Sequence, residues 1–305
     1  MSDELLFNLF VDCEATQPAV DDAELGRRAV TGIVEVLEAN DLRGTFHVIP
    51  GDAEAMPELY RDLHERGHEI GLHVHPAAQG YGEFLGVYGP DDQRKIIGEA
   101  KDRLEQAVGF AVHTFCPGYG SMNDFTYSVL VELGFRHGIC TLPTRILPEC
   151  ASVHAGAPLG IHYAHPFNRV LSGDLDFVEI PPTVDPDSRM WGGKHPQDLR
   201  IELVDAKNHW YTMHKAVQRQ LAERAAVPYL RAITHNTFDY ADPRDFRRLT
   251  LTGVIERARS IAAQTDMKLT GATAEQIANR YRAAVPRTAE GSTLTLDRRG
   301  YTTTT

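Results

Sequence analysis

The sequence has few cysteines, no long apolar run and no surplus of positive charge. Its four cysteines show no C-x-x-C spacing, so we expect reduced thiols rather than a disulfide framework. No apolar run approaches the roughly 20 residues that span a bilayer. The formal net charge is -11, which would repel phosphates and argues against duplex nucleic acid or an anionic membrane surface as the main partner.

Signals of other protein classes are also missing. Met1–Leu6 carries no basic region and runs into an apolar stretch, so we expect no secretory signal and a cytosolic protein that acts on soluble substrates. The glycine-rich segment Gly118–Ser121 lacks the G-x-x-x-x-G-K-[ST] spacing of a phosphate-binding loop. The chain also lacks a G-x-S-x-G motif. These absences argue against a nucleotide-dependent enzyme and against a serine hydrolase of the α/β-hydrolase type.

What the sequence does contain is an alternation of strand-like and helix-like segments. Leu5–Asp12 is an almost continuous apolar run, typical of a strand buried on both faces. The segment after Asp21 and Asp22, which can cap a helix, keeps its apolar residues on one face as far as Asn40. Further strands are predicted at 45–49, 69–74, 112–115, 138–141, 178–181 and 229–234. Further helices are predicted at 57–66, 91–108, 124–133, 199–224 and 245–264.

This repeat predicts an α/β fold, most simply a distorted (β/α) barrel of seven or eight units. A doubly wound open sheet is the alternative. The chain has 305 residues, 42% of them hydrophobic, and no linker rich in Pro, Gly or Ser divides the series. We therefore predict a single catalytic domain over residues 1–285. Residues 286–305 are polar and are predicted to form a peripheral tail.

Polar side chains follow the predicted strands at the points where apolar runs stop. They lie in Asp12–Glu14, His73–His75 and His235–Asn236. The carboxyl ends of parallel strands share one rim, so we expect these side chains to meet. Residues i and i+2 of an extended segment point to the same side, which presents two carboxylates together and two imidazoles together. One carboxylate with two imidazoles is a catalytic zinc set that leaves a position open for water, and the other carboxylate would take a proton from that water.

These segments resemble the motifs of the polysaccharide deacetylases of carbohydrate esterase family 4, over residues 5–265. Phe10–Glu14 is similar to the first motif of that family, which implies that Asp12 is the general base and Glu14 a metal ligand. Gly67–His73 is similar to the segment before the metal-binding histidines. The other matching segments are Phe115–Gly120, Phe177–Pro181 and Ile233–His235 followed by Asp239–Tyr240.

The resemblance implies roles for the remaining site residues. His73 and His75 would join Glu14 as ligands of a divalent metal, for which zinc is the first candidate. His235 would be the general acid, and a main-chain N–H near Tyr119 would stabilise the oxyanion. Substrate contacts are implied for the third motif, namely Gly118, Tyr119 and Gly120.

The sequence departs from the family pattern in two places. The family spaces its metal-binding histidines as H-x-x-x-H, whereas position 77 is Ala here and the candidate second ligand is His75. The third motif of the family carries an Arg that pairs with the catalytic base, and Cys116 occupies that position. As a replacement cation for Asp12 we consider Arg145 or Arg169.

Three functions are compatible with this sequence. The first is metal-dependent removal of an N-acyl group, most simply N-acetyl, from a sugar or a sugar-like small molecule. The second keeps the metal and hydrolyses a cyclic imide, a ureide or another small amide. The third is a carbohydrate-binding protein with weak catalysis, which the replacement at Cys116 supports. In all three the expected partner is a small molecule or carbohydrate, and the sequence leaves the oligomeric state open.

Overall fold

The protein is described by a computed structural model that covers residues 3–190, 193 and 195–288. At its centre, β1 (Glu4–Cys13) lies between two parallel neighbours, β12 (Tyr229–His235) and β2 (Gly44–Val48). Every residue of β1 after Glu4 is buried. The continuous apolar run at the start of the sequence therefore forms the buried parallel strand that it predicts.

From β1 to β5 the sheet continues in chain order. Its strand order is β12-β1-β2-β3-β4-β5-β9-β8, and β13 also pairs with β1. Neighbours are parallel except for the antiparallel pair of β8 and β9. The remaining strands of this sheet are β3 (Glu69–Val74), β4 (Thr114–Pro117), β5 (His137–Gly138), β8 (His162–Tyr163), β9 (Val178–Glu179) and β13 (Lys268–Gly271). Two antiparallel ribbons pair β6 (Ile146–Leu147) with β7 (Ser152–Val153), and β10 (Val184–Arg189) with β11 (Pro196–Asp198).

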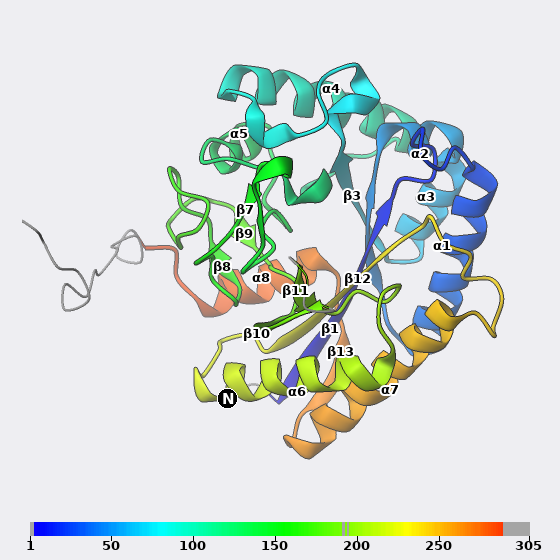
Figure 1. The fold of residues 1–305 in the computed structure, drawn as a ribbon, viewed down its shortest axis with the longest axis vertical. Coiled ribbons are helices and arrows are strands. Elements are labelled where there is room, and N and C mark those ends of the chain that lie inside the picture. The colour runs from blue at the N-terminus through cyan, green and yellow to red at the C-terminus, as the bar shows by residue number, and fades with distance from the viewer. Residues whose placement is uncertain (1–2, 191–192, 194, 289–305) are drawn as a thin grey trace, which may run out of the picture.

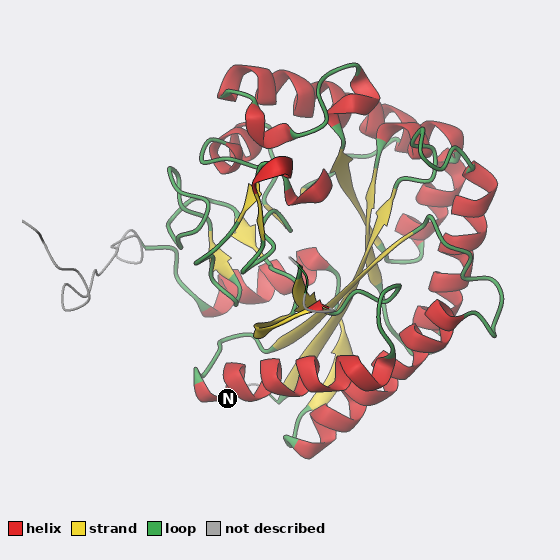
Figure 2. Ribbon diagram, viewed as in Figure 1, coloured by secondary structure: helices red, strands yellow, loops and turns green. Residues whose placement is uncertain are grey.

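Helices connect the strands and surround the curved sheet on its outer side (Figure 1, Figure 2). In the first of them, Ala29, Ile33 and Leu37 are buried on one face, as the periodicity predicts. Its first turn is capped by Asp22, which accepts a hydrogen bond from the Leu25 N–H. The helices are α1 (Ala23–Glu38), α2 (Pro50–Ala55), α3 (Pro57–Glu65), α4 (Pro90–Val108), α5 (Thr126–Glu132), α6 (Ala206–Ala222), α7 (Phe246–Gln264) and α8 (Ala274–Ala284).

This arrangement confirms the predicted (β/α) barrel in a distorted form. The strands follow one another around the sheet without the reversal of order that defines a doubly wound sheet, so that alternative is wrong. Within the described part of the chain, no strand ladder joins β8 to β12. The barrel is therefore a curled sheet that hydrogen bonds do not close at this point.

The predicted helix at 199–224 is partly wrong. Residues 196–198 form β11, and the helix begins only at Ala206, because the Asp205 side chain accepts a hydrogen bond from the Asn208 N–H and caps it there. The sequence pattern also does not predict β13 or α8. Both have short apolar patterns, since β13 is only partly buried and the buried residues of α8 are two alanines and one isoleucine.

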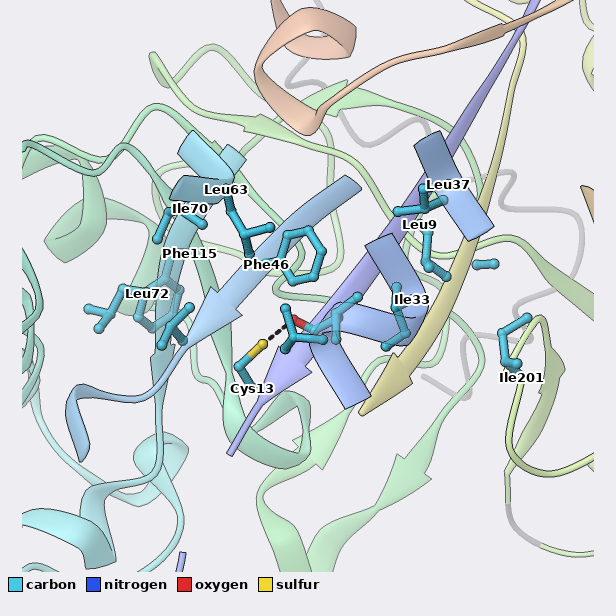
Figure 3. Close-up of a cluster of buried hydrophobic side chains, with 14 of the residues drawn as sticks. Leu9, Cys13, Ile33, Leu37, Phe46, Leu63, Ile70, Leu72, Phe115 and Ile201 are labelled. Atoms are coloured by element: carbon cyan, nitrogen blue, oxygen red, sulfur yellow. Dashed lines mark hydrogen bonds between the residues drawn. The ribbon is translucent and has the colours of Figure 1, made fainter. Parts of the chain in front are cut away.

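A hydrophobic core fills the space between the sheet and the helices (Figure 3). Phe46 of β2, Leu72 of β3, and Ile33 and Leu37 of α1 all belong to this core. Cys13 is fully buried in this core, and its Sγ lies 3.8 Å from the Val11 carbonyl oxygen. Because side chains alternate along a strand, residues 12 and 14 point away from this core.

No described helix is long and apolar enough to cross a membrane. Of the predicted polar tail, only residues 286–288 are described, and residues 289–305 lie outside the described part of the chain. The single catalytic domain over residues 1–285 stays a prediction.

Candidate metal centre and active site

A cavity of about 400 Å³ opens at the carboxyl ends of β1, β3, β4 and β12. Strand register brings its residues together, since Asp12 pairs with His235 of β12 and His47 of β2, and His73 pairs with Cys116 of β4. Strand ends at one rim are where parallel α/β folds assemble sites. The predicted site residues that line this cavity are Asp12, Glu14, His73, His75, Tyr119, Gly120 and His235.

Glu14, His73 and His75 each direct one donor atom toward a common point. The Glu14 Oε2 atom lies 3.0 Å from His75 Nε2 and 3.3 Å from His73 Nε2. The two Nε2 atoms are 3.1 Å apart. Zinc bonds nitrogen and oxygen at about 2.0–2.2 Å, so two ligands of a tetrahedral ion are about 3.3 Å apart. This set of donors therefore fits a divalent metal.

Both imidazoles are oriented by a hydrogen bond at the other ring nitrogen. His73 Nδ1 lies 3.0 Å from the Cys116 carbonyl oxygen, which can only accept. His75 Nδ1 lies 2.6 Å from Glu83 Oε1. Each bond places the ring proton on Nδ1 and leaves the Nε2 lone pair free to bind a metal. The H-x-H spacing therefore presents two suitably oriented nitrogens, although it departs from the H-x-x-x-H pattern.

The surrounding charges favour a cation at the common point. Burial lowers the pKa of His75, but the Glu14 and Glu83 carboxylates outweigh this effect and raise the pKa to about 9. Burial raises the pKa of Glu14, yet its hydrogen bonds with His73 and His75 are stronger, and the net pKa is lowered. A proton on His75 and a metal ion compete for the same lone pair. The Glu14 and Glu83 carboxylates, which stabilise the proton on His75, therefore also stabilise a bound metal ion.

Replacing Glu83 with glutamine is expected to weaken zinc binding by about 10–100-fold, as is typical when the partner of a metal-binding histidine is lost. The amide has the same size, but it lacks the charge that holds the proton on His75 Nδ1. Zinc affinity is measured by competition with a chromophoric chelator. Glu58→Gln is the matched control, because the Glu58 side chain is 82% exposed and pairs with Arg61 on the surface. Equal affinities in the two variants would contradict the role of Glu83.

A second group of side chains, Asp12, His73 and Cys116, is also compact enough to hold an ion. In this group the His73 Nδ1 atom lies 3.9 Å from Asp12 Oδ1, but it already donates to the Cys116 carbonyl. Burial raises the pKa of the Cys116 thiol well above its usual value, and the thiolate, not the thiol, binds metals. We therefore favour the group made by Glu14, His73 and His75.

The Asp12 carboxylate lies beside the common point. It is buried, and its Oδ1 atom has no hydrogen-bond partner among residues 3–190, 193 and 195–288. Nitrogen atoms of His47, His73 and His235 surround it at 3.8–3.9 Å. Burial, more than the neighbouring charges, lowers the pKa of His47 well below its usual value. This imidazole is therefore neutral. Asp12 is thus a carboxylate with a free oxygen, as a general base requires.

Arg200 lines the same cavity as Asp12 and interacts with its charge. Arg169 forms its ion pair with Asp124 instead, and Arg145 makes no ion pair with Asp12 in the described part of the chain. Burial lowers the pKa of Arg200, but neighbouring carboxylates, Asp12 among them, outweigh this and raise it. The sequence pattern does not indicate Arg200 as a site residue, because Arg200 falls in the segment wrongly predicted as helix.

His235 pairs with an acid that the sequence analysis also missed. Its Nδ1 lies 2.7 Å from Glu202 Oε1, and its Nε2 lies 3.8 Å from Asp12 Oδ2. Burial lowers the pKa of His235, but the Glu202 carboxylate outweighs burial, and the net pKa is raised. The imidazole therefore keeps its proton to a higher pH, which is the state required of a general acid.

Buried Asp52 and Asn236 hold the chain where β1 ends. Asn236 Oδ1 accepts a hydrogen bond of 2.7 Å from the Glu14 N–H, and its Nδ2 donates to Asp52 at 2.8 Å. Asp52 also accepts from the N–H groups of Ala15 and Thr16, at 3.2 and 2.7 Å. These bonds fix the backbone around Glu14 and hence the direction of its side chain.

The third motif forms one wall of the cavity. Tyr119 has a left-handed backbone with φ of 58° and is 49% exposed, and its ring meets the His75 ring edge-on at 5.3 Å between centroids. Gly120 is left-handed as well, with φ of 61°. Gly118 packs against the His75 ring, where an added Cβ would lie 2.5 Å from Cε1. It is not among the described residues that line the cavity.

A family model described as polysaccharide deacetylase matches residues 19–138. The predicted resemblance to the polysaccharide deacetylase superfamily is thereby confirmed over these residues. The matched residues include His73, His75 and the third motif, whereas Asp12, Glu14 and His235 lie outside the matched range. No curated protein matches the chain.

Several solved structures share the fold of this chain. One is a protein from Mycobacterium smegmatis described as a polysaccharide deacetylase, with 19% identity and a TM-score of 0.62 over 94% of this chain and 93% of that one. Puue allantoinase has 18% identity and a TM-score of 0.62 over 94% and 93% of the two chains. A protein from Pseudomonas aeruginosa PAO1, described as a polysaccharide deacetylase, has 18% identity and a TM-score of 0.62 over 93% of each chain. At these identities the likeness establishes the fold alone.

Several residues around the candidate site carry no signal in the sequence. Glu83 lies in a polar segment after His75 without periodicity, and His47 lies inside an ordinary strand pattern. Glu83 orients His75 from eight residues further along the chain, and Glu202 orients His235 from 33 residues before it, and only the folded structure shows these contacts. A strand-end pattern finds residues that reach the cavity, but not the residues that support them.

Proposed function

We propose that this protein is a metal-dependent hydrolase that removes an N-acyl group, most simply N-acetyl, from a sugar or sugar-like small molecule. The observation that carries the proposal is the convergence of the Glu14, His73 and His75 donor atoms within 3.0–3.3 Å of one another, next to the free Asp12 oxygen. Zinc is the metal that we propose, since one carboxylate and two imidazoles form a catalytic zinc set with an open position.

The chain's own residues would divide the proton transfers between them. Asp12 would take a proton from the attacking water through its unbonded Oδ1, and His235 would protonate the leaving amine through Nε2. Glu202 would hold His235 in the protonated state, and a main-chain N–H near Tyr119 would donate to the developing oxyanion. A divalent ion would supply Lewis acidity toward the acyl carbonyl and toward water.

Replacing Glu202 with glutamine is expected to narrow the pH range of activity on the basic side. The Glu202 carboxylate raises the pKa of His235, so its loss lowers that pKa. A general acid works only while protonated, and activity is lost as pH rises through its pKa. The basic limb of the kcat profile should therefore move to lower pH while the acidic limb stays in place. An unmoved basic limb would show that Glu202 does not set the protonation of His235.

The proposed activity is tested with the zinc-loaded full chain and N-acetylglucosamine or its N,N′-diacetylated dimer. The expected result is release of acetate that stops when a chelator removes the metal and returns when zinc is added. Saccharide binding without acetate release would contradict hydrolysis and favour a carbohydrate-binding protein instead.

A second candidate is the hydrolysis of a cyclic imide, a ureide or another small amide. Two observations favour it, namely a cavity of only about 400 Å³ and a fold likeness to Puue allantoinase along 94% of this chain. The same metal point and proton donors would serve this reaction, because it also opens an amide bond. Ring opening of hydantoin or dihydrouracil without acetate release from N-acetyl sugars would favour this candidate over the first.

A further inference from the structure

Arg145 is a buried cation in the wall of the cavity that no ion pair neutralises. It lies between β5 and β6, is 6% exposed and lines the cavity. In the described part of the chain, no carboxylate lies within ion-pair distance of its guanidinium. Burying a charge without a counter-charge costs solvation free energy, so a buried charged group normally pairs with an opposite charge or a bound ion.

The bonds that Arg145 does make involve neutral partners. Its Nη1 donates to the Tyr119 carbonyl oxygen at 2.6 Å, and its Nη2 lies 3.1 Å from His195 Nδ1. Burial, with Arg145 and Arg200 nearby, lowers the pKa of His195, so this imidazole accepts as a neutral group. The Nε atom of Arg145 is buried without a partner among the described residues. Arg145 therefore has no ion-pair partner and at least one unused hydrogen-bond donor among the described residues.

The other guanidinium of the cavity is compensated. Arg200 lies 3.5 Å from Glu202 and 3.8 Å from Asp198. Arg145 is therefore the cavity-lining guanidinium that has no ion pair among the described residues, and the more distant Asp198 carboxylate opposes only part of the effect of burial. Burial and the neighbouring Arg200 lower the pKa of Arg145 to about 10, which leaves it charged at neutral pH.

Arg145 lines the same cavity as the proposed metal point. Tyr119 links the two, because its carbonyl oxygen accepts from Arg145 and its ring meets His75 at 5.3 Å. A small molecule whose acyl group lies at Glu14, His73 and His75 could thus extend toward the Arg145 guanidinium, which has no ion pair among the described residues. Guanidinium groups bind carboxylates and phosphates through paired, charge-assisted hydrogen bonds.

We propose that the substrate carries an oxyanion group, a carboxylate or a phosphate, which binds Arg145 while the scissile amide lies at the metal point. This inference rests on the proposed function, because it deepens the substrate class of the same site. It narrows the candidates to acidic N-acyl sugars or acidic cyclic amides. Neutral members of either class would leave the Arg145 charge unpaired.

The test uses pairs of compounds that differ in one anionic group. The pairs are N-acetylglucosamine with its 6-phosphate, N-acetylglucosamine with N-acetylmuramic acid, and dihydrouracil with dihydroorotate. For each pair, calorimetry measures binding to the zinc-loaded full chain, and kinetics measures kcat/KM. The expected result is a preference for the anionic member of at least one pair, and which pair shows it separates phosphate from carboxylate and sugar from cyclic amide.

Arg145→Gln should reduce that preference by roughly 30-fold or more, since loss of one partner of a buried charge pair has an effect of this size. Arg145→Lys keeps the charge and should retain part of the preference. Arg103→Gln is the control, because Arg103 pairs with Glu54 on the surface. If Arg145 only supports Tyr119, the variants would lower kcat/KM for both members equally and leave the ratio unchanged, which would overturn the proposal.

The two proposals fail in different ways. Anion preference in binding without turnover of any pair would keep the role of Arg145 and reject the proposed hydrolysis. Turnover of both members of each pair at the same kcat/KM would support the hydrolysis and reject the oxyanion group. Equal binding of the two members of each pair would also reject the oxyanion group. If Arg145→Gln does not fold, the preference of the unmodified protein and of Arg145→Lys still decides the question.

Discussion

Replacing Asp12 with asparagine is expected to lower kcat by about 10²–10⁴-fold while zinc stays bound. The estimate is the usual contribution of a general base. Asparagine has nearly the same shape but cannot take a proton from water. Asp12 is not one of the three converging donors, so the metal affinity should change little. Acetate release and zinc content are measured on the same purified sample.

Two controls make the Asp12 result specific. Asp91→Asn removes a carboxylate whose side chain is 96% exposed, and it should leave turnover unchanged. The thermal unfolding temperature of Asp12→Asn reports whether loss of the buried charge disturbs the fold. Turnover within a factor of about two of the unmodified protein would contradict the role of Asp12 as base, while loss of zinc would assign it to the metal instead.

Replacing His75 with alanine is expected to weaken zinc binding by more than about 100-fold and to abolish turnover. Loss of a group that only supports a metal ligand already costs about 10–100-fold, and His75 would be a ligand itself. The variant removes the nitrogen that lies 3.0 Å from Glu14 Oε2. Zinc affinity is measured by chelator competition, and the kinetic assay follows at saturating zinc.

His113→Ala is the matched control, because this histidine is exposed and lies outside the cavity. Zinc affinity of His75→Ala equal to that of the control would show that His75 is not a ligand. In that case the alternative group of Asp12, His73 and Cys116 would become the candidate metal site.

The fold and the cavity-facing residues could be predicted because both depend on local patterns. The apolar run of β1 and the polar residues that end it are adjacent in sequence, and strand ends of a parallel sheet meet by geometry. His73 and His75 share one side of the chain because extended residues alternate. Asp12, Glu14 and His235 reach the cavity for the same reason.

The supporting residues could not be predicted, because their contacts join segments that no local pattern links. Glu202 contacts His235 because β11 and an isolated bridge between Arg200 and Ile233 bring its segment beside β12. The helical periodicity predicts a helix for most of this segment instead. Asp52 lies in a short helix, yet its carboxylate binds Asn236 from the far end of the chain. Such contacts depend on tertiary packing rather than on spacing along the sequence.

The most direct test is anomalous diffraction at the zinc edge from crystals of the zinc-loaded protein. The account predicts one strong peak within about 2.0–2.2 Å of Glu14 Oε2, His73 Nε2 and His75 Nε2. A peak that lies beyond bonding distance of His75 Nε2, or the absence of any peak beside Glu14, would contradict the metal centre on which the proposed hydrolysis depends.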